Sequence, residues 1–402
     1  MENSGGFCSK RLQNVDAYLQ RIVDTGEAAG VNALIVRRGV TAYCKSFGMQ
    51  DRERNIPMRN DTIFRIYSMT KTFTIAAAMT LYEKGLFKLH DPIAEFLPAF
   101  KELKVARHDS RGIVQLEKAR RPVTFEHLFT MTSGIPYPGE QSYSARLFRE
   151  AEKASIEDAA RGKPWATARV VDEAAKVPLC FQPGEYWMYG FSHDLLGRLI
   201  EVISGKTLGL YLKDTIFDPL ELTDTAFYVP AEKQPRLAAV YAHTEAGLQR
   251  QQEPDWVDPG KEKAPPAYES GGGGLASTLA DMSRYGCLLV KGGKLGNTRV
   301  LSRKTVDLIR QNHVGPELMS SFAFPQMAGY GYGLGVRTMQ DKVPAGLNGS
   351  LGEWAWGGKQ GTWYCIDPEE DLVAVFLIQR FPGGNDNLPK RFAQTVYGAI
   401  DD

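Results

Sequence analysis

Residues 64–82 read FRIYSMTKTFTIAAAMTLY, an extended run that leads into a long apolar segment. The apolar segment predicts a helix, and Ser68 and Lys71 stand three residues apart at its start. Side chains at that spacing share one face of a helix, which brings the Lys71 amine within reach of the Ser68 hydroxyl. The helix N-terminus also favours negative charge on the serine oxygen. The pair is therefore a candidate nucleophile and base.

The surroundings of this pair carry more information than the pair itself, because an SxxK match can also be an exposed lysine beside a helix-capping serine. Residues 82–86 (YEKGL) and 91–93 (DPI) follow the apolar segment. With residues 64–81 they resemble the SxxK serine hydrolases of the penicillin-recognising group: class C β-lactamases, DD-peptidases and, most closely, family VIII carboxylesterases. The resemblance implies an α/β fold, in which an antiparallel β-sheet is flanked by helices and carries an inserted helical subdomain. It also implies that Ser68 is acylated.

A second motif, PGEYWMYG at residues 183–190, matches the stretch that ends in the proton-relay tyrosine of these enzymes. The resemblance implies that Tyr189 passes a proton to the leaving group. β-Lactamases carry Tyr-x-Asn here, whereas this chain has Phe191, so the amide that holds a β-lactam side chain is missing. This departure favours an ester substrate. The next residue, Ser192, is expected to cap a helix that starts at His193.

A third motif, WGGKQGT at residues 356–362, matches the strand that supplies the oxyanion hole. β-Lactamases carry Lys-Thr-Gly at this place, and family VIII esterases often carry Trp-Gly-Gly. By this alignment the backbone amides of Ser68 and Lys359 form the oxyanion hole. A register that matches residues 359–361 to Lys-Thr-Gly would move the donor by three residues. The Lys359 side chain is expected to be solvated, with contact to a substrate carboxylate as the alternative.

Aromatic side chains near these motifs are expected to wall an apolar acyl pocket, although packing in the core is the alternative for each of them. The glycines of the third motif would let the backbone approach the acyl group closely. The predicted substrate-binding residues are Trp356, Gly357, Gly358, Trp187, Tyr137 and Phe191.

The two ends of the chain predict parts of one antiparallel sheet. Strand-like runs flank a hairpin turn at residues 37–40 and another at 367–371. Amphipathic helices are expected at residues 12–23 and at 387–400, the second covering one face of the sheet. Further matches to the family at 123–134, 272–282 and 331–335 extend the resemblance over nearly the whole chain.

Helix-type patterns separated by Pro and Gly occupy the middle of the chain. We therefore expect an α/β subdomain formed by residues 1–90 and 206–402 and a helical subdomain formed by residues 91–205. The active site is expected at their interface.

The composition excludes several classes of function. The 402 residues include 48 basic and 47 acidic side chains, a net charge of +1 that does not favour nucleic acid or an anionic membrane. Apolar runs are too short to cross a bilayer, and the N-terminus lacks the apolar core of a secretory signal, so a cytoplasmic location is expected. The five scattered Cys and six His do not form a metal-site pattern. Residues 271–274 are four glycines without the features of a phosphate loop, which indicates close backbone packing. No cofactor is expected.

The expected function is a serine hydrolase that cleaves small-molecule carboxylic esters with short to medium acyl chains. Ser68 attacks the carbonyl, and either Lys71 or Tyr189 is the formal base. Within the same fold the alternatives are a β-lactamase or DD-peptidase, an oligoamide hydrolase and an acyltransferase, with weak β-lactam hydrolysis as a side activity. A catalytically silent ligand-binding descendant is the alternative outside enzymes. The sequence does not fix the oligomeric state.

Overall fold

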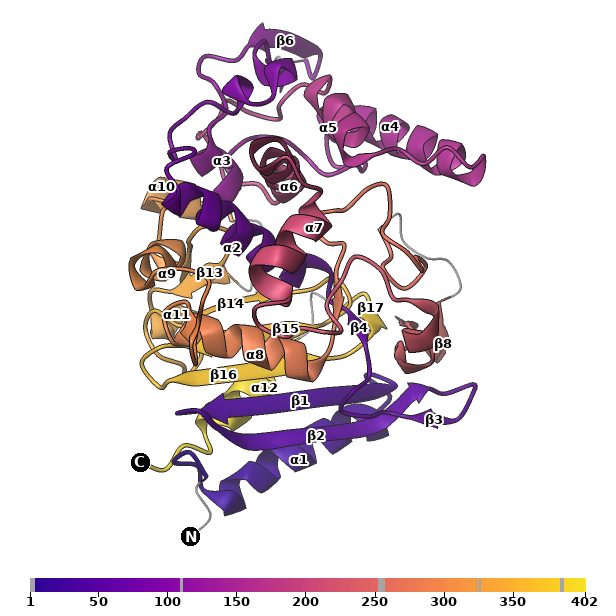
Figure 1. Ribbon diagram of the computed structural model, residues 1–402, viewed down its shortest axis with the longest axis vertical. Coiled ribbons are helices and arrows are strands. Elements are labelled where there is room, and N and C mark those ends of the chain that lie inside the picture. Colours follow the sequence, from indigo (N-terminus) through magenta and orange to yellow (C-terminus); the bar gives the residue numbers. More distant parts are fainter. Residues whose placement is uncertain (1–3, 109–110, 252–256, 323, 325–326, 384–386) are drawn as a thin grey trace.

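Figure 1 shows the computed structural model, which describes residues 4–108, 111–251, 257–322, 324, 327–383 and 387–402. Its centre is an eight-stranded sheet with helices on both faces, in which all neighbouring strands run antiparallel. This confirms the expected fold class. The strands, in spatial order, are β12 (Tyr330–Tyr332), β13 (Arg337–Met339), β14 (Trp354–Gly357), β15 (Trp363–Asp367), β16 (Leu372–Leu377), β1 (Gly30–Arg37), β2 (Val40–Asp51) and β3 (Ile56–Pro57).

Both ends of the chain contribute to the centre of this sheet, as predicted. The hairpin β1–β2 turns at Arg38 and Gly39, whose φ angles of 53° and 77° are those of a left-handed turn. Strand β16 pairs with β1 from Asn32↔Leu377 to Arg37↔Leu372. The two predicted hairpins, more than 300 residues apart, are therefore neighbours in the sheet.

Helices cover the two faces of the sheet in separate hydrophobic clusters. Helices α1 (Ser9–Asp24) and α12 (Leu388–Tyr397) lie on one face, where Leu19 and Phe392 are fully buried. Helix α8 (Leu279–Val290) lies on the other face against β1, β15 and β16. All eight residues of β1 are buried, because the strand is covered from both sides.

Helix α2 (Thr70–Glu83) connects the sheet with the helical part of the molecule. Its residues 70–81 are all buried, and Phe73 stacks on Tyr285 of α8 at a centroid distance of 3.9 Å. The helices of that part are α3 (Phe125–Phe129), α4 (Tyr143–Ala160), α5 (Thr167–Ala175), α6 (Ser192–Ser204) and α7 (Leu208–Leu212), of which α6 and α7 pack against α2.

The segment 91–205 differs from the purely helical expectation. It also contains the antiparallel hairpin of β5 (Lys104–His108) and β6 (Val114–Lys118). Val105 of β5 forms a further bridge to Leu179, and such a distant pairing is not visible in local periodicity. One hydrophobic cluster extends from the sheet through α2 to α6. The division into two subdomains therefore stays a prediction.

Among the described residues no helix is long and apolar enough to cross a membrane. The remaining strands and helices lie around the central sheet and the helices that cover it. They are β4 (Phe64–Arg65), β7 (Tyr241–Thr244), β8 (Gly247–Arg250), β9 (Ala276–Ser277), β10 (Lys294–Leu295), β11 (Thr298–Arg299), β17 (Arg380–Phe381), α9 (Arg303–Arg310), α10 (Pro316–Met319) and α11 (Lys342–Ala345).

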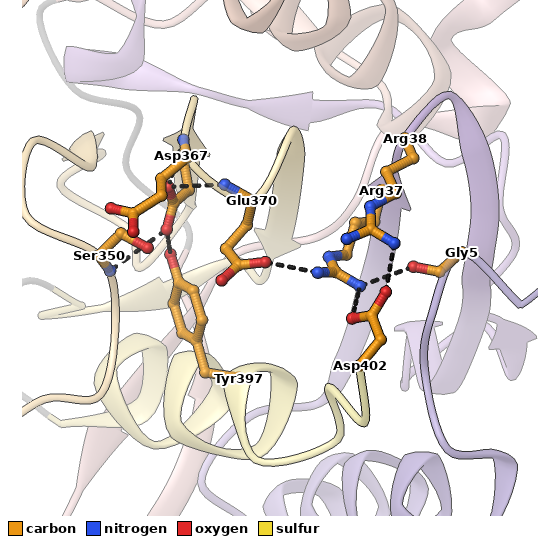
Figure 2. Close-up of polar contacts among 9 residues, drawn as sticks. Gly5, Arg37, Arg38, Ser350, Asp367, Glu370, Tyr397 and Asp402 are labelled. Carbon is orange, nitrogen blue, oxygen red and sulfur yellow. Dashed lines mark hydrogen bonds and ion pairs between the residues drawn. The ribbon is translucent and has the colours of Figure 1, made fainter.

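A buried arginine ties the two ends of the chain to the sheet. The Arg37 guanidinium forms ion pairs with Glu370 at 2.5 Å and Asp402 at 2.7 Å, and donates to the carbonyl oxygen of Gly5 at 2.9 Å. Figure 2 shows these contacts beside the hydrogen bond from Tyr397 to Asp367. The last residue of the chain is thereby held against the β1–β2 turn.

Candidate active site

Ser68 lies where an extended segment turns into a buried helix. Strand β4 leads into the 3₁₀ turn η1 (Tyr67–Met69), and α2 begins directly after it. Tyr67 has a φ of 41°, an unusual value for a residue with a side chain, so the backbone bends sharply just before the serine. Ser68 is half-buried and lines a cavity of about 1130 Å³. The start of α2 thus presents its hydroxyl to the cavity.

Lys71 lies one helical turn further on and has no exposed surface. Its Nζ atom is 3.2 Å from Ser68 Oγ, as the spacing predicted. The same atom is 3.0 Å from the Tyr137 hydroxyl and 2.6 Å from the carbonyl oxygen of Gly272. The amine is therefore held in place by contacts with three different segments of the chain.

Tyr189 is close to this pair but meets it through its ring. Lys71 Nζ lies 4.7 Å from the centroid of the Tyr189 ring, and the phenol oxygen accepts a hydrogen bond from Trp356 Nε1 at 3.2 Å. The structure thus brings together the predicted Ser68, Lys71 and Tyr189. The contact between Tyr189 and Trp356 joins the second sequence motif to the third.

Tyr137 has a more central place than the pocket wall that the sequence suggested. Its hydroxyl contacts Lys71 directly, and its ring lies 5.8 Å from that of Tyr189. Burial, together with the negative charge of Asp194, raises the pKa of the Tyr137 phenol well above its usual value. Tyr137 is therefore a neutral hydroxyl group beside the amine.

Asp194, on α6, is a buried carboxylate that sequence reasoning missed. Its Oδ1 atom accepts hydrogen bonds from the Tyr268 hydroxyl at 2.7 Å, from Ser270 Oγ at 2.6 Å and from the backbone N–H of Gly272 at 3.2 Å. Burial raises its pKa, whereas the two side-chain hydrogen bonds and the charge of Lys71 oppose this shift. Asp194 thus fixes the turn at Gly272, whose carbonyl oxygen is in contact with the Lys71 amine.

Three glycines of the run at 271–274 pack closely against other segments, as the composition indicated, and Gly272 lies against this carboxylate. A Cβ atom on Gly272 would collide with Asp194 Oδ2 and would lie 2.8 Å from the Tyr137 hydroxyl.

The prediction that Ser192 caps a helix was wrong. Phe191 is the N-cap of α6, and Ser192 Oγ is hydrogen-bonded to Ser133 Oγ at 2.9 Å instead.

The third motif forms the turn between β14 and β15 beside the nucleophile. Thr362 Oγ1 donates to the carbonyl oxygen of Ile66 at 3.3 Å, two residues before Ser68. A Cβ atom on Gly358 would lie 2.5 Å from that same oxygen, so only glycine fits. The Gly358 amide is bonded within the turn, to the carbonyl oxygen of Thr362 at 2.7 Å. Lys359, the predicted amide donor, is the next residue and lines the cavity.

Most of the predicted substrate-binding residues lie on the cavity wall. Trp187 is not among the described lining residues, because it is buried behind Tyr189 and packs on Phe322, Phe324 and Tyr332. The predicted residues that line the cavity are Ser68, Tyr137, Tyr189, Phe191, Trp356, Gly357, Gly358 and Lys359.

The chain is similar in sequence to several bacterial proteins over nearly its full length. The Beta-lactamase family model matches residues 15–397. Protein Rv1367c of Mycobacterium tuberculosis is 30% identical, with 97% of this chain and 99% of that protein covered. Esterase EstB of Burkholderia gladioli is 27% identical, with 90% of this chain and 89% of EstB covered.

The similarity extends to three-dimensional structure. The solved structure of EstCE1, a hydrolase with promiscuous acyltransferase activity, superposes with a TM-score of 0.81 at 26% identity. The superposition covers 96% of this chain and 98% of EstCE1. Together with the serine–lysine pair at the start of α2, these matches show that the chain belongs to the beta-lactamase family and to its superfamily of serine hydrolases with esterase and acyltransferase relatives.

Proposed function

We propose that this protein is a carboxylesterase that works through an acyl-enzyme on Ser68. The observation that carries the proposal is the contact between Ser68 Oγ and the buried Lys71 amine at the wall of a cavity that is lined in part by aromatic side chains. Phe191 lies on that wall where β-lactamases place an amide side chain, which supports an ester rather than a β-lactam. EstB, named as an esterase, supports the same substrate class.

The first step forms the acyl-enzyme. The unprotonated Lys71 amine takes the proton of Ser68 as the serine oxygen bonds to the ester carbonyl carbon. The carbonyl oxygen gains the negative charge, and the backbone amides of Ser68 and Lys359 stabilise it. When the tetrahedral intermediate collapses, the bond to the alkoxide breaks, Tyr189 delivers a proton to the departing oxygen, and the proton held by Lys71 passes to Tyr189.

The second step releases the acid. Water adds to the acyl carbon, and its proton passes to Lys71, either directly or through the Tyr189 hydroxyl. The bond to Ser68 Oγ then breaks and the serine recovers its proton. Trp356 Nε1 orients the Tyr189 oxygen in both steps, since its N–H group donates to that oxygen.

Acyl transfer to an alcohol is a second candidate, because EstCE1 is described as having promiscuous acyltransferase activity. The two reactions share the first step and differ only in the nucleophile that attacks the acyl-enzyme. The product ratio of butyric acid to butyl butyrate, measured with p-nitrophenyl butyrate in the presence of n-butanol, separates them.

The substrate class is tested by comparing turnover of p-nitrophenyl butyrate, nitrocefin and a D-Ala-D-Ala peptide. The proposal expects the butyrate ester to be cleaved much faster than the other two, and Ser68→Ala to abolish the reaction. Equal or faster turnover of nitrocefin or of the peptide would contradict it.

A further inference from the structure

The two backbone amides assigned to the oxyanion hole, those of Ser68 and Lys359, lie on separate turns. Each is oriented by a hydrogen bond within its own turn. The carbonyl oxygen of Tyr67 accepts from the first amide of α2, and that of Gly358 accepts from the Gly361 amide at 3.0 Å. Because the C=O and N–H groups of a trans peptide point in opposite directions, these bonds set the directions of the two N–H groups. They do not set the distance between them.

The side chain of Gln360 connects the two turns. Its Nε2 atom donates to the Tyr67 hydroxyl at 3.2 Å, and the two residues are buried, with exposed fractions of 2% and 6%. The backbone of Gln360 is itself fixed, because its carbonyl oxygen accepts from the N–H group of Arg380 on β17 at 3.0 Å. The contact therefore joins the residue after Lys359 to the residue before Ser68.

Tyr67 has a backbone conformation that its surroundings must maintain. Its φ of 41° is unfavourable for a residue with a Cβ atom, and such a conformation persists only where neighbouring contacts hold it. The peptide bond that follows Tyr67 carries the Ser68 amide. A hydrogen bond at the end of the Tyr67 side chain thus acts on the group that precedes the nucleophile.

The stability of the fold does not explain why a glutamine is at position 360. Its Oε1 atom is buried and has no hydrogen-bonding partner among the described residues. A buried amide oxygen without a donor is destabilising, and a methionine of similar length would fill the space without this cost. Side chains that reduce stability in this way are typical of functional sites. What the glutamine supplies here is the N–H group that holds Tyr67.

We infer that Gln360 is a positioning residue, which sets the distance between the Ser68 and Lys359 amides through its contact with Tyr67. This inference rests on the proposed function, in which both amides donate to one oxyanion. Gln360 is not among the described residues that line the cavity, so it acts on the reaction through its neighbours. A small displacement of either amide is expected to weaken the stabilisation of the transition state.

The first test replaces Gln360 by methionine. Gln360→Met is expected to keep the wild-type Tm and to lose about ten-fold or more in kcat with p-nitrophenyl butyrate. KM is expected to stay within about two-fold, because acylation and deacylation pass through the same kind of oxyanion and slow together. A variant that keeps the wild-type kcat, or one that loses Tm and kcat together, would overturn the inference.

Gln50→Met is the matched control. Gln50 is 3% exposed and lies outside the described cavity wall, and both ends of its amide are bonded. Its Nε2 atom donates to the carbonyl oxygen of Pro235 at 2.7 Å, and its Oε1 atom accepts from Thr62 Oγ1 at 3.1 Å. This variant is expected to lower Tm and to keep the wild-type kcat, the reverse of Gln360→Met.

A double-mutant cycle tests the contact itself. Tyr67→Phe removes the hydroxyl that accepts the hydrogen bond from Gln360. If the two side chains act through this bond, the double variant loses no more activity than Gln360→Met alone. Losses that multiply in the double variant would show that the residues act independently and would contradict the inference.

The rate of labelling by a fluorophosphonate separates this inference from the proposed function, since it needs no turnover of an ester. Phosphonylation of Ser68 places a charged oxygen at the same two amides, so labelling of Gln360→Met is expected to be about ten-fold or more slower than that of wild type. If wild type is labelled but does not cleave p-nitrophenyl butyrate, the esterase proposal fails and slower labelling of the variant still supports the role of Gln360. Equal labelling rates would overturn that role, and a wild type that is neither labelled nor active would overturn both.

Discussion

Lys71 Nζ lies 2.6 Å from the carbonyl oxygen of Gly272, the shortest of its three polar contacts. The two residues are 201 positions apart in the sequence. The carbonyl group is aimed at the amine because Asp194 accepts a hydrogen bond from the N–H group of the same glycine. The position of the candidate base thus depends on a carboxylate that does not touch it.

Gly272→Ala is expected to reduce kcat/KM by about ten-fold or more, because the added methyl group would collide with Asp194 and displace the carbonyl group from Lys71. Gly273→Ala is the matched control, since a Cβ atom there has its nearest neighbour at 3.9 Å. Steady-state kinetics with p-nitrophenyl butyrate and Tm values of both variants check this. Equal loss of activity in the two variants would disprove the specific role of Gly272.

Asp194→Asn keeps the shape of the side chain and removes its charge. We expect kcat/KM to fall about ten-fold or more, since the buried network loses a charged acceptor. Steady-state kinetics with p-nitrophenyl butyrate check this, and an unchanged kcat/KM in a variant with the wild-type Tm would contradict it.

The two tyrosines beside Lys71 are expected to differ in effect. Tyr189→Phe removes the proposed proton donor and is expected to lower kcat by about 10²-fold or more. Tyr137→Phe removes one of three contacts to the Lys71 amine, so a smaller loss of about ten-fold is expected. Single-turnover kinetics of the two variants compare them directly, and the reverse order would transfer the proton-donor role to Tyr137.

The ion pair between Arg37 and Asp402 predicts that the stability of the fold changes with pH in the acid range. Hydrogen bonding to Arg37 lowers the pKa of the Asp402 carboxyl below its ordinary value of 3.8. The contribution of the pair is therefore present above pH 3.8 and is lost as the pH falls through the lowered pKa of the folded state. Asp402→Asn is expected to lower Tm at neutral pH, with the difference from wild type narrowing below pH 3.8. A Tm difference between wild type and Asp402→Asn that stays constant down to acid pH would contradict this.

The parts of the site that the sequence predicted are those with local signals. The three-residue spacing of Ser68 and Lys71 places both at the start of one helix, and the stretch before Phe191 places Tyr189 beside them. The paired hairpins were also predictable, because alternation and turn residues are local features.

The parts that sequence reasoning missed depend on distant contacts. Asp194 reads as an ordinary polar residue near a helix start, and only the fold brings it to Ser270 and Gly272. The four consecutive glycines at 271–274 were the one signal that could have indicated a close partner there. Ser192 forms a hydrogen bond with Ser133 instead of capping the helix, and this too depends on a side chain 59 residues away.

The central claim, that Ser68 is the acylated nucleophile, is tested most directly by intact mass spectrometry after brief reaction with a fluorophosphonate, followed by peptide mapping. The account predicts one adduct per chain, located on Ser68 and absent in Ser68→Ala. An adduct on another residue, or one that persists in Ser68→Ala, would contradict it.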